Sequence, residues 1–411
     1  MHYLFYQHNV QQFFIRHIDK YDGILVPFSI SASFPSGTYG FLRALLAKDP
    51  SKHFAMDPRS ALFQHKWDRK KVREPHKKAA AIFGAPFTTF GVERYLGLED
   101  FSSVGIIERV TEACIRYQRQ FRMLQEERRK LDKYQKLLSL GTLPEIENPQ
   151  KYIPPYFQAS DGNDPWLEKS LACIEYAAKL VAPEELCPVI HFTDWERFDA
   201  WDSVRARLGA AGVLSYFVYP NKFKEHEASA TELGVYVSAV ESAARASFRP
   251  LTLHGGYFAI ALQKKGLDGF GNGVGYGEWR DSGYHRGGSA EVRVYIPKLH
   301  RFLDAAAAQS LIAADAAYFT ADSDLLTEYS AANKPLTLVQ PQEALDHFME
   351  SRYQEIGFVS NHSEAEISGE LHETVQHLEM IGELESENYG KSLTRWADKI
   401  AEKKKAVAGN Q

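Results

Sequence analysis

Four carboxylates stand at or near the ends of apolar runs, and they are the side chains best suited to chemistry. They are Asp57 in FAMDPRSALFQ, Asp194 in HFTDW, Asp268 in GLDGF, and Glu278. A carboxylate can transfer a proton, activate water or stabilise developing positive charge. We expect Asp57 to be the catalytic group, with the other three as alternatives. Asp57 and Asp194 also have a structural interpretation, because aspartate commonly caps the first turn of a helix.

A glycine-rich stretch, GLDGFGNGVGYGE from Gly266 to Glu278, raises the question of what approaches its backbone so closely. Every second residue from Gly269 to Gly277 is glycine, so one face of an extended chain would carry no side chains. Glycine weakens a strand and is often found where a ligand or another backbone comes close. Together with nearby aromatic residues, this indicates a pocket for a flat ring beside the carboxylates. A loop without such a role is the alternative.

The candidate ring pocket combines aromatic, glycine and amide residues from several of the same segments. Its members are Phe34, Tyr39, Gln64, Tyr219, His254, Gly255, Gly256, Tyr257, Gly271 and Asn272. The aromatic side chains could stack on a ring, although packing inside the core is the commoner role of a buried aromatic residue. His254 has the same two interpretations, since many buried histidines are simply hydrogen-bonded core residues.

No motif in the sequence requires a metal ion or an organic cofactor. There is no HExxH, no GxSxG, no GK[ST] after the glycines and no kinase signature. The three cysteines, Cys114, Cys173 and Cys187, form no CxxC pair, which is typical of a reducing cytoplasm and argues against structural zinc. No apolar run approaches about 18 residues and no signal-peptide pattern is present. We therefore expect a cytoplasmic protein without a membrane span.

Short apolar runs that alternate with helical patterns indicate the elements that must position these residues. The eight candidate strands are Gly23–Ile30, His53–Pro58, Tyr152–Ser160, Pro188–Asp194, Val213–Pro220, Pro250–Gly256, the glycine stretch and Val292–His300. This alternation predicts a parallel sheet with outer helices, and eight strands favour a (β/α)8 or TIM barrel. The carboxyl ends of the strands carry the active site in such a barrel, and Asp57 stands at one of them.

A long interruption separates the second and third of these strands and is expected to form a basic helical insertion at about 66–143. Within it, Val104–Leu140 repeats apolar residues at three- and four-residue steps, which predicts a long amphipathic helix. Lys66–Lys78 holds seven Lys or Arg residues against two acids. The barrel domain is expected to occupy residues 1–320, with this insertion inside it.

Charge is distributed unevenly along a chain whose formal net charge is −5. The basic insertion is suited to the phosphate backbone of a nucleic acid. The residues expected to contact that backbone are Lys66, Lys70, Lys71, Arg73, Arg116, Arg119, Arg128, Arg129 and Arg280. Residues 321–411 form an acidic, helical C-terminal extension that would cover the barrel or mediate self-association. Solvated helix faces are the simpler explanation of each charged run.

The segment LHGGYFAIALQKKGLDGF (Leu253–Phe270) resembles the tRNA-guanine transglycosylase superfamily. In that family a glycine-rich strand end and a helix lead into a Gly-hydrophobic-Asp-hydrophobic-Phe segment. Asp57 in DPRSALFQ is similar to the aspartate of the family's Asp-Ser-Gly-Gly-Phe-Gln signature, with two extra residues before Phe63 and Gln64. The likeness covers about Gly23–His300, and it implies a TIM barrel that acts on the N-glycosidic bond of a nucleic-acid base.

Two departures from the family pattern change the chemistry that the resemblance implies. The family's nucleophilic aspartate follows the Gly-Asp-Phe segment, where this chain has Gly271, and the family's zinc-binding cysteine cluster is absent. The resemblance therefore implies hydrolysis, in which a carboxylate activates water or stabilises an oxocarbenium-like sugar, rather than covalent base exchange. In size, barrel pattern, missing zinc cysteines and basic insertion, the chain is also similar to a divergent anti-phage branch of the superfamily. That branch is represented by a DNA glycosylase that removes glucosylated hydroxymethylcytosine.

A DNA N-glycosylase acting in anti-phage defence is the function that these expectations favour. It would turn a modified base out of the duplex, remove it and leave an abasic site; glucosylated hydroxymethylcytosine is the base that the resemblance implies. DNA is then the expected partner, and no metal or cofactor is required. The alternatives are a tRNA or DNA base-exchange transglycosylase, a nucleic-acid-binding protein without catalysis, and a (β/α)8 enzyme acting on a small metabolite.

Overall fold

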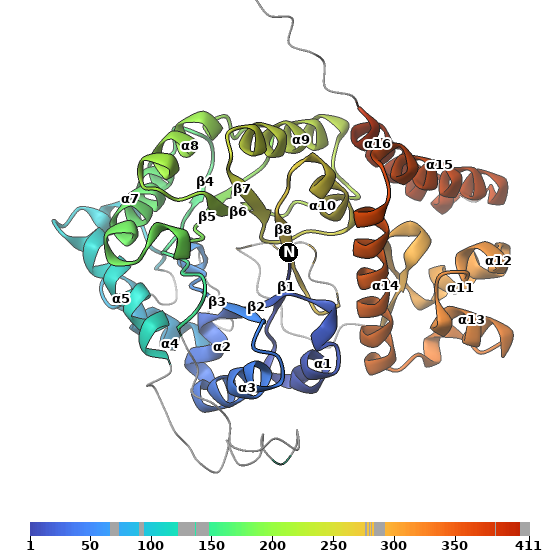
Figure 1. The fold of residues 1–411 in the computed structure, drawn as a ribbon, viewed down its shortest axis with the longest axis horizontal. Coiled ribbons are helices and arrows are strands. Elements are labelled where there is room, and N and C mark those ends of the chain that lie inside the picture. Colours follow the sequence, from blue (N-terminus) through green and yellow to red (C-terminus); the bar gives the residue numbers. More distant parts are fainter. Residues whose placement is uncertain are drawn as a thin grey trace, which may run out of the picture. The chain divides into compact units, whose positions relative to one another are not determined.

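The computed structural model describes residues 1–65, 74–89, 94–121, 136, 148–275, 278, 280, 282, 292–382 and 384–402. The chain divides into two compact units, whose elements are labelled in Figure 1. The first unit consists of Met1–Phe223, Ser242–Gly255 and Leu267–Gly288. The second unit consists of Lys224–Glu241, Gly256–Gly266 and Ser289–Gln411.

The first unit contains an eight-stranded sheet in which every pairing is parallel. Its strands are β1 (His2–Phe5), β2 (Gly23–Pro27), β3 (His53–Asp57), β4 (Gln158–Ala159), β5 (Val189–Phe192), β6 (Ser215–Pro220), β7 (Arg249–Thr252) and β8 (Gly269–Gly273). The spatial order is β3-β2-β1-β8-β7-β6-β5-β4, so the first and last strands in sequence are neighbours. Such an order is that of a (β/α)8 barrel.

The barrel closes between β3 and β4 through a short stretch of chain just before β4. Lys151 forms a parallel bridge with Ala55 of β3, and Tyr152 forms one with Leu186, ahead of β5. Two prolines, Pro154 and Pro155, separate these bridges from β4. Because proline lacks an amide proton, this part of the strand cannot form a regular ladder. We refer to the junction between β3 and the 151–159 segment as the seam.

The interior of the barrel is filled by side chains from alternate strand positions. In a strand, successive side chains point to opposite faces, so every second residue faces the centre. The buried cluster accordingly takes Tyr3 and Phe5 from β1, and Phe217 and Tyr219 from β6. Its other members are Leu25, Ala55, Ala61, Ile153, Tyr156, Cys187, Val189, Leu251 and Leu253. The barrel is thus a packed core rather than a channel.

The set of eight strands differs from the predicted set at its two ends. His2–Phe5 was not predicted as a strand but forms β1, so the predicted second strand is β3 and the long interruption follows it. Val292–His300 was predicted as a barrel strand, and this is wrong. Its residues Arg293–Ile296 form β9, which pairs antiparallel with β10 (Arg301–Asp304) in the second unit. A short apolar run shows that a strand is buried, but not which strand it pairs with.

Helices connect the barrel strands of the first unit. They are α1 (Gln11–Arg16), α2 (Phe28–Ser33), α3 (Pro35–Lys48), α4 (Glu74–Phe83), α5 (Ile106–Gln120), α7 (Pro165–Leu180) and α8 (Trp201–Ala210), with short 3-10 turns that include η3 (Ser60–Gln64). Helices α4 and α5 lie in the predicted insertion. Residues Ile106, Val110 and Cys114 form a buried stripe on α5, as expected for an amphipathic helix. The predicted continuation of this helix beyond Phe121 lies outside the described residues, apart from Lys136.

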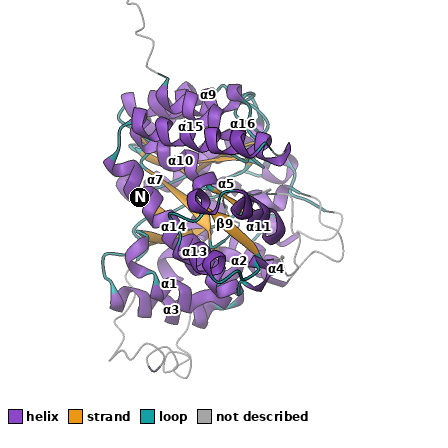
Figure 2. Cartoon of the chain, turned by 90° about the vertical axis from the view of Figure 1, so that its right-hand side faces the viewer, coloured by secondary structure: helices purple, strands orange, loops and turns teal. Residues whose placement is uncertain are grey.

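The second unit is helical around the β9–β10 pair. Its helices are α9 (Ala230–Arg245, up to Glu241), α10 (Tyr257–Ala261), α11 (Ala305–Ala314), α12 (Ala316–Phe319), α13 (Asp324–Ala331), α14 (Pro341–Asn361), α15 (Glu364–Ile381) and α16 (Leu384–Ala401). Helices α14 and α11 pack against β9 (Figure 2). The predicted helical character of the chain beyond residue 320 is confirmed. Among the described residues, no helix combines the length and the apolar character needed to cross a membrane.

Candidate active site

Asp57 ends strand β3 at the carboxyl end of the barrel, and its side chain is 1% exposed. Three donors hold the carboxylate. The Arg59 amide and the Tyr156 hydroxyl donate to Oδ1 at 3.0 and 2.8 Å, and Arg59 Nε donates to Oδ2 at 2.9 Å. Hydrogen bonds to a charged group are stronger than neutral ones. The carboxylate is therefore fixed in one orientation at the barrel mouth.

Arg59 adopts a left-handed backbone conformation, with φ 49° and ψ 37°. This conformation costs a non-glycine residue about 1–2 kcal/mol. It allows both the amide and the side chain of Arg59 to reach the same carboxylate. The guanidinium also lies 5.2 Å from the centre of the Phe5 ring, within the range of a cation–π contact. These contacts offset the backbone cost and position Asp57.

Tyr156 reaches Asp57 across the seam. Ser60 holds its backbone, because the Tyr156 amide donates to Ser60 Oγ at 2.8 Å and Ser60 Oγ donates to the Tyr156 carbonyl at 2.5 Å. Burial, and then the nearby Asp57 charge, raise the pKa of Tyr156 well above its usual value. The hydroxyl therefore stays protonated and donates to the carboxylate. Tyr156 is not among the residues predicted from the sequence, although YIPPYF places it within a predicted strand.

A small cavity lies next to Asp57. Its volume is about 10 Å³, room for about one water molecule. It is lined by Asp57, Arg59, Ala61, Leu62, Tyr156, Tyr219, Leu253, His254, Arg280 and Ser282. Asp57 is the one carboxylate among these described lining residues. The structure thus brings together four predicted site residues, Asp57, Tyr219, His254 and Arg280, but leaves no space for a base among them.

Arg280 was predicted to contact the nucleic-acid backbone, and it lines this cavity. Burial, and then the neighbouring Arg59 charge, lower the pKa of Arg280 from 12.5 to about 10. Its side chain is therefore still cationic at neutral pH. Its carbonyl accepts hydrogen bonds from the Lys222 amide at 3.0 Å and the Tyr219 hydroxyl at 3.5 Å. Two guanidinium groups, those of Arg59 and Arg280, thus line the cavity beside one carboxylate.

His191 does not line the cavity but contacts one of its lining residues, Tyr219, and it was not predicted as a site residue. It lies on β5, its ring stacks on Tyr219 at 4.0 Å, and its Nδ1 lies 2.8 Å from the Tyr219 carbonyl oxygen. Burial lowers the pKa of His191 to about 3, so the ring is neutral. Nε2 has no hydrogen-bond partner among the described residues. The strand pattern PVIHFTD was a usable signal, because a polar side chain in a barrel strand must be neutral or paired.

Polar side chains connect the loops around the mouth. The Gln64 side chain pairs with the Gln158 backbone at 2.7 and 3.1 Å, which makes Gln64 a support for β4. Ser282 Oγ donates to Gln158 Oε1 at 2.8 Å and lies 3.0 Å from His65 Nε2. The predicted role of Gln64 was to bind a base. Its amide groups are instead occupied by backbone.

Two glycines of the glycine stretch, Gly269 and Gly271, lie against the backbone of other segments and do not border an open pocket. A Cβ atom on Gly269 would lie 2.3 Å from the Met1 carbonyl oxygen. One on Gly271 would lie 2.7 Å from the Leu253 carbonyl oxygen. Neighbouring barrel strands, rather than a flat ring, therefore require these glycines. The prediction of a ring pocket next to Gly271 is corrected accordingly, because sequence shows that space is needed but not what fills it.

The other three predicted carboxylates do not join Asp57 in the cavity. Asp268 directly precedes β8, at the amino end of the barrel strands, whereas Asp57 ends β3. Asp194 follows β5 but is bound by Arg197, whose amide donates to Oδ1 at 2.9 Å and whose Nε lies 3.5 Å from Oδ2. Asp194 therefore caps a turn and not a helix, because the next helix, α8, begins only at Trp201. Glu278 is half-buried after β8 and is not one of the lining residues.

The remaining pocket candidates of the first unit lie elsewhere. Phe34 is 48% exposed and stacks on His8 at 4.2 Å. Tyr39 is 1% exposed within α3, where it packs near Phe121 as a core residue. Asn272 is buried in β8 and its Oδ1 lies 2.7 Å from His2 Nε2. The Gly255 amide donates to the Gly271 carbonyl.

Two pocket candidates, Gly256 and Tyr257, belong to the second unit. The Gly256 amide donates to Glu225 Oε1 at 2.9 Å. The Glu225 carboxylate also accepts from the amides of Phe258 and Ala259 at the start of α10. The Tyr257 ring stacks on His300 at 3.3 Å. Sequence proximity to His254 suggested a shared pocket, but the chain passes from one unit to the other between Gly255 and Gly256.

The basic residues are only partly described. Lys66, Lys70, Lys71, Arg73, Arg128 and Arg129 lie outside the described residues. Arg116 is exposed on α5. Arg119 donates to the Leu180 carbonyl at 2.5 Å and lies 5.7 Å from the Tyr152 ring, so it supports the seam.

No group of three or more His, Cys, Asp or Glu side chains suited to a metal ion occurs within the described part of the chain. The three cysteines are buried, and burial raises the pKa of both Cys173 and Cys187 to about 12, which leaves these thiols protonated. Neither a protein-family model nor a curated protein sequence matches the chain significantly.

Proposed function

We propose that the chain is an N-glycoside hydrolase that removes a modified base from DNA, with Asp57 as the catalytic carboxylate. The observation that carries this proposal is the position of Asp57, a buried carboxylate at the carboxyl end of a (β/α)8 barrel. Active sites of this fold are built at that end. The resemblance of Leu253–Phe270 to base-transferring enzymes supplies the class of bond.

Asp57 is suited to stabilise positive charge on a sugar while water attacks. Its Oδ2 accepts one hydrogen bond, from Arg59, and retains a further lone pair. In the proposed reaction the bond between the sugar carbon and the base nitrogen breaks. Water supplies a hydroxyl to the sugar carbon and a proton to the departing base. The neighbouring cavity has the size of that water molecule.

The substrate must displace protein groups to reach Asp57. The cavity of about 10 Å³ does not admit a base, and Arg280 and Ser282 line it from the chain after β8. A flipped nucleotide brings its own phosphates, which attract a guanidinium. Arg280 would therefore exchange its place beside Asp57 for a phosphate contact. Unstacking and unpairing the base costs a few kcal/mol, which contacts of this kind would offset.

Hydrolysis is favoured over base exchange by the surroundings of Gly271. A nucleophilic aspartate at this position would place its Cβ 2.7 Å from the Leu253 carbonyl oxygen and 3.1 Å from Leu25 Cδ1. Real Cβ atoms do not approach backbone so closely. This backbone therefore has no room for the second carboxylate that covalent exchange requires.

The direct test is release of bases from DNA that contains glucosylated hydroxymethylcytosine. We expect abasic sites to accumulate in this DNA and not in unmodified DNA, and Asp57→Asn to slow their formation by about 10²- to 10⁴-fold. Abasic sites are counted by labelling their aldehydes. The matched control is Asp194→Asn, which removes the same charge from a turn cap at the same end of the barrel.

Three outcomes contradict parts of this proposal. Full activity of folded Asp57→Asn would remove Asp57 from the mechanism. Release of the resident base without abasic sites, together with incorporation of labelled free base, would identify an exchange enzyme instead. Binding with neither reaction would identify a non-catalytic protein.

A further inference from the structure

His191 carries a buried acceptor that no described residue satisfies. The residue is 1% exposed, and its Nε2 has no hydrogen-bond partner among the described residues. Buried polar groups are almost always paired, because an unpaired one loses its hydrogen bond to water and gains none in return. A leucine or phenylalanine in the same place would avoid this cost. The unpaired nitrogen therefore indicates a partner that comes from outside the chain.

The other ring nitrogen fixes the chemical character of Nε2. His191 Nδ1 lies 2.8 Å from the Tyr219 carbonyl oxygen, and a carbonyl oxygen only accepts hydrogen bonds. Nδ1 must therefore carry the proton, which leaves a lone pair on Nε2 of the neutral ring. Burial lowers the pKa of His191 to about 3, so the ring is neutral at physiological pH. Nε2 accordingly accepts a hydrogen bond and does not donate one.

The strand pattern places His191 in the same inward-facing layer as the Asp57 site. Val189 belongs to the buried barrel cluster, and His191 follows it by two residues on β5, so both side chains point to the barrel interior. The His191 ring stacks on Tyr219 at 4.0 Å and lies edge-on to the Tyr156 ring at 6.1 Å. Both tyrosines line the cavity beside Asp57, and Tyr156 donates to that carboxylate. His191 thus lies directly behind the wall of the cavity.

Ser282 connects the cavity to the strand pair that holds His191. Its Oγ donates to Gln158 Oε1 at 2.8 Å, and Gln158 is the β4 residue paired with His191 in the ladder. Ser282 also lines the cavity, so a substrate base that reaches Asp57 must displace it. That displacement opens the mouth on the side of β4 and β5. A base that enters there approaches His191.

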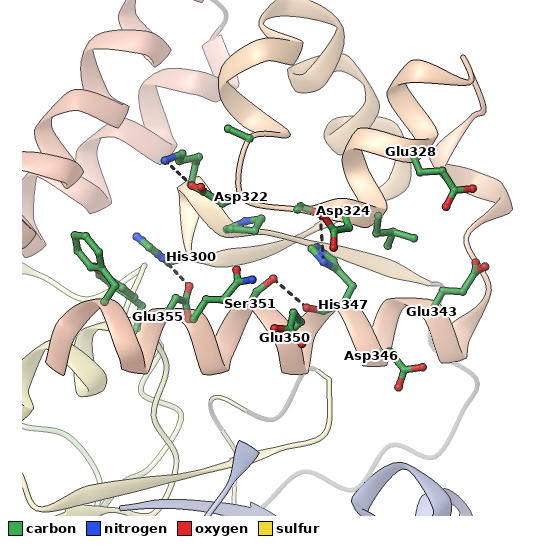
Figure 3. A pocket seen from close by; sticks show the side chains of 18 of the residues that line it. His300, Asp322, Asp324, Glu328, Glu343, Asp346, His347, Glu350, Ser351 and Glu355 are labelled. Atoms are coloured by element: carbon green, nitrogen blue, oxygen red, sulfur yellow. Dashed lines mark hydrogen bonds and ion pairs between the residues drawn. The ribbon is translucent and has the colours of Figure 1, made fainter. Parts of the chain in front are cut away.

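A cavity of the second unit shows the opposite combination of space and pairing. This second-unit cavity has a volume of about 870 Å³, and Figure 3 shows Glu355 of α14 and His300 in its lining. Glu355 Oε1 accepts from the Tyr295 hydroxyl at 2.8 Å and lies 2.7 Å from His300 Nδ1. Arg352 forms an ion pair with Glu355 Oε2 at 2.8 Å. This carboxylate is thus bound within the protein, whereas the barrel mouth contains an acceptor without a partner.

We propose that His191 Nε2 accepts a hydrogen bond from the substrate base and so selects bases that carry an amino group. The inference rests on the proposed function, because it takes a flipped nucleotide as the ligand. Within a DNA strand the sugar and the phosphates carry no hydrogen-bond donor, so the donor must belong to the base. An amino group projects from the ring, as at the edge of a cytosine, and therefore reaches further into the barrel than a ring N–H. His191 would thus determine specificity without taking part in bond cleavage.

Duplex DNA with one modified pyrimidine is the probe, and affinity is measured by fluorescence anisotropy. The target sugar carries a 2′-fluorine, which destabilises an oxocarbenium-like sugar and so suppresses cleavage. No base stands opposite the target, so base pairing does not affect the comparison. One probe has glucosylated hydroxymethylcytosine, and the other has the same base with hydrogen in place of the 4-amino group. We expect the full chain to bind the amino probe at least about tenfold more tightly.

Two substitutions separate the acceptor from the packing of the ring. His191→Asn keeps an amide donor near the position of Nδ1 but has no group at Nε2, and it should bind the two probes within about twofold of each other. His191→Gln places its carbonyl oxygen near the position of Nε2 and should retain most of the preference. A variant that is merely less well folded would bind both probes more weakly and leave their ratio unchanged.

Three results would overturn the inference. They are equal binding of the two probes by the unaltered chain, an unchanged preference in His191→Asn, and a preference that disappears when glucose is absent from both probes. The last result would place the donor on the glucose. Failure of the proposed function alone would look different, because the chain would still prefer the amino probe but would release no base from the same DNA without fluorine.

Discussion

The barrel mouth and the second-unit cavity contain the same buried arrangement with very different amounts of space. Asp57 is held by Arg59 and the Tyr156 hydroxyl, and Glu355 is held by Arg352 and the Tyr295 hydroxyl. The cavity beside Asp57 has a volume of about 10 Å³, whereas the one beside Glu355 has about 870 Å³. A paired, buried carboxylate therefore does not identify a ligand site by itself. Unoccupied space must accompany it.

A buried group in each unit should make the unfolding free energy depend on pH, with opposite signs in the two units. This is the largest difference that we expect between them. Burial lowers the pKa of His191 in the first unit to about 3, below the ordinary 6.5, so its stabilising contribution is complete above pH 6.5 and is lost as the pH falls. The loss amounts to up to about 5 kcal/mol at 1.36 kcal/mol per pKa unit. His191→Asn should flatten the acid limb of the unfolding free energy, measured by urea titration.

The contribution of Glu225 in the second unit to stability should change with pH in the opposite direction. Burial raises its pKa from 4.5 to about 6, against the effect of the amides that it accepts, so its neutral form is favoured in the fold. Its contribution is complete below pH 4.5 and is lost as the pH rises through 6, by about 2 kcal/mol. Glu225→Gln should remove this dependence. Identical pH profiles of the two variants would contradict the comparison.

Removing the two arginines tests whether the two carboxylate networks are equivalent. Arg352 is completely buried, and Arg352→Met should cost about 3–5 kcal/mol because Glu355 loses its buried cation. The Arg59 side chain is 12% exposed, and Arg59→Met should cost about 1.5–3 kcal/mol, since Asp57 keeps the amide of residue 59 and the Tyr156 hydroxyl. Chemical denaturation measures both. A larger loss of unfolding free energy for Arg59→Met than for Arg352→Met would contradict this prediction.

Replacing two glycines by alanine should change the unfolding free energy in opposite directions, and these are the smallest effects that we expect. Gly271→Ala would place a methyl group 2.7 Å from a backbone carbonyl and should cost about 1–3 kcal/mol. Gly357 lies within α14 and has nothing within 4 Å of a Cβ position, so Gly357→Ala should stabilise by about 0.5–1 kcal/mol. The two melting temperatures should therefore move in opposite directions. Movement in the same direction would refute the account of Gly271.

The elements could be predicted from sequence where periodicity and strand ends carried the information. Alternating strands and helices indicated the barrel, and the rule that strand ends form the site placed Asp57 correctly at its mouth. β1 was missed because its four residues, HYLF, are too few to show a period. β9 has a similar apolar pattern, but its partner, β10, could not be recognised from that pattern.

Side-chain surroundings could not be predicted in the same way. Tyr39 is an aromatic residue of the kind that lines ring pockets, but it is a buried core residue of α3. Gly271 lies against the backbone of Leu253, which is distant in sequence. The second-unit cavity combines residues near 257, 300, 322, 350 and 370, none of which forms a motif. Such sites depend on tertiary packing, which a single sequence does not display.

The hydrogen bond between Tyr156 and Asp57 joins the two sides of the seam. On one side is β3, and on the other is the proline-interrupted chain before β4, where Lys151 and Tyr152 supply the bridges. A ligand that took the place of Tyr156 on the carboxylate would therefore also break this hydrogen bond across the seam. Binding of such a ligand and closure of the barrel would then be thermodynamically linked, so its affinity would depend on how strongly β3 is held to the 151–159 segment.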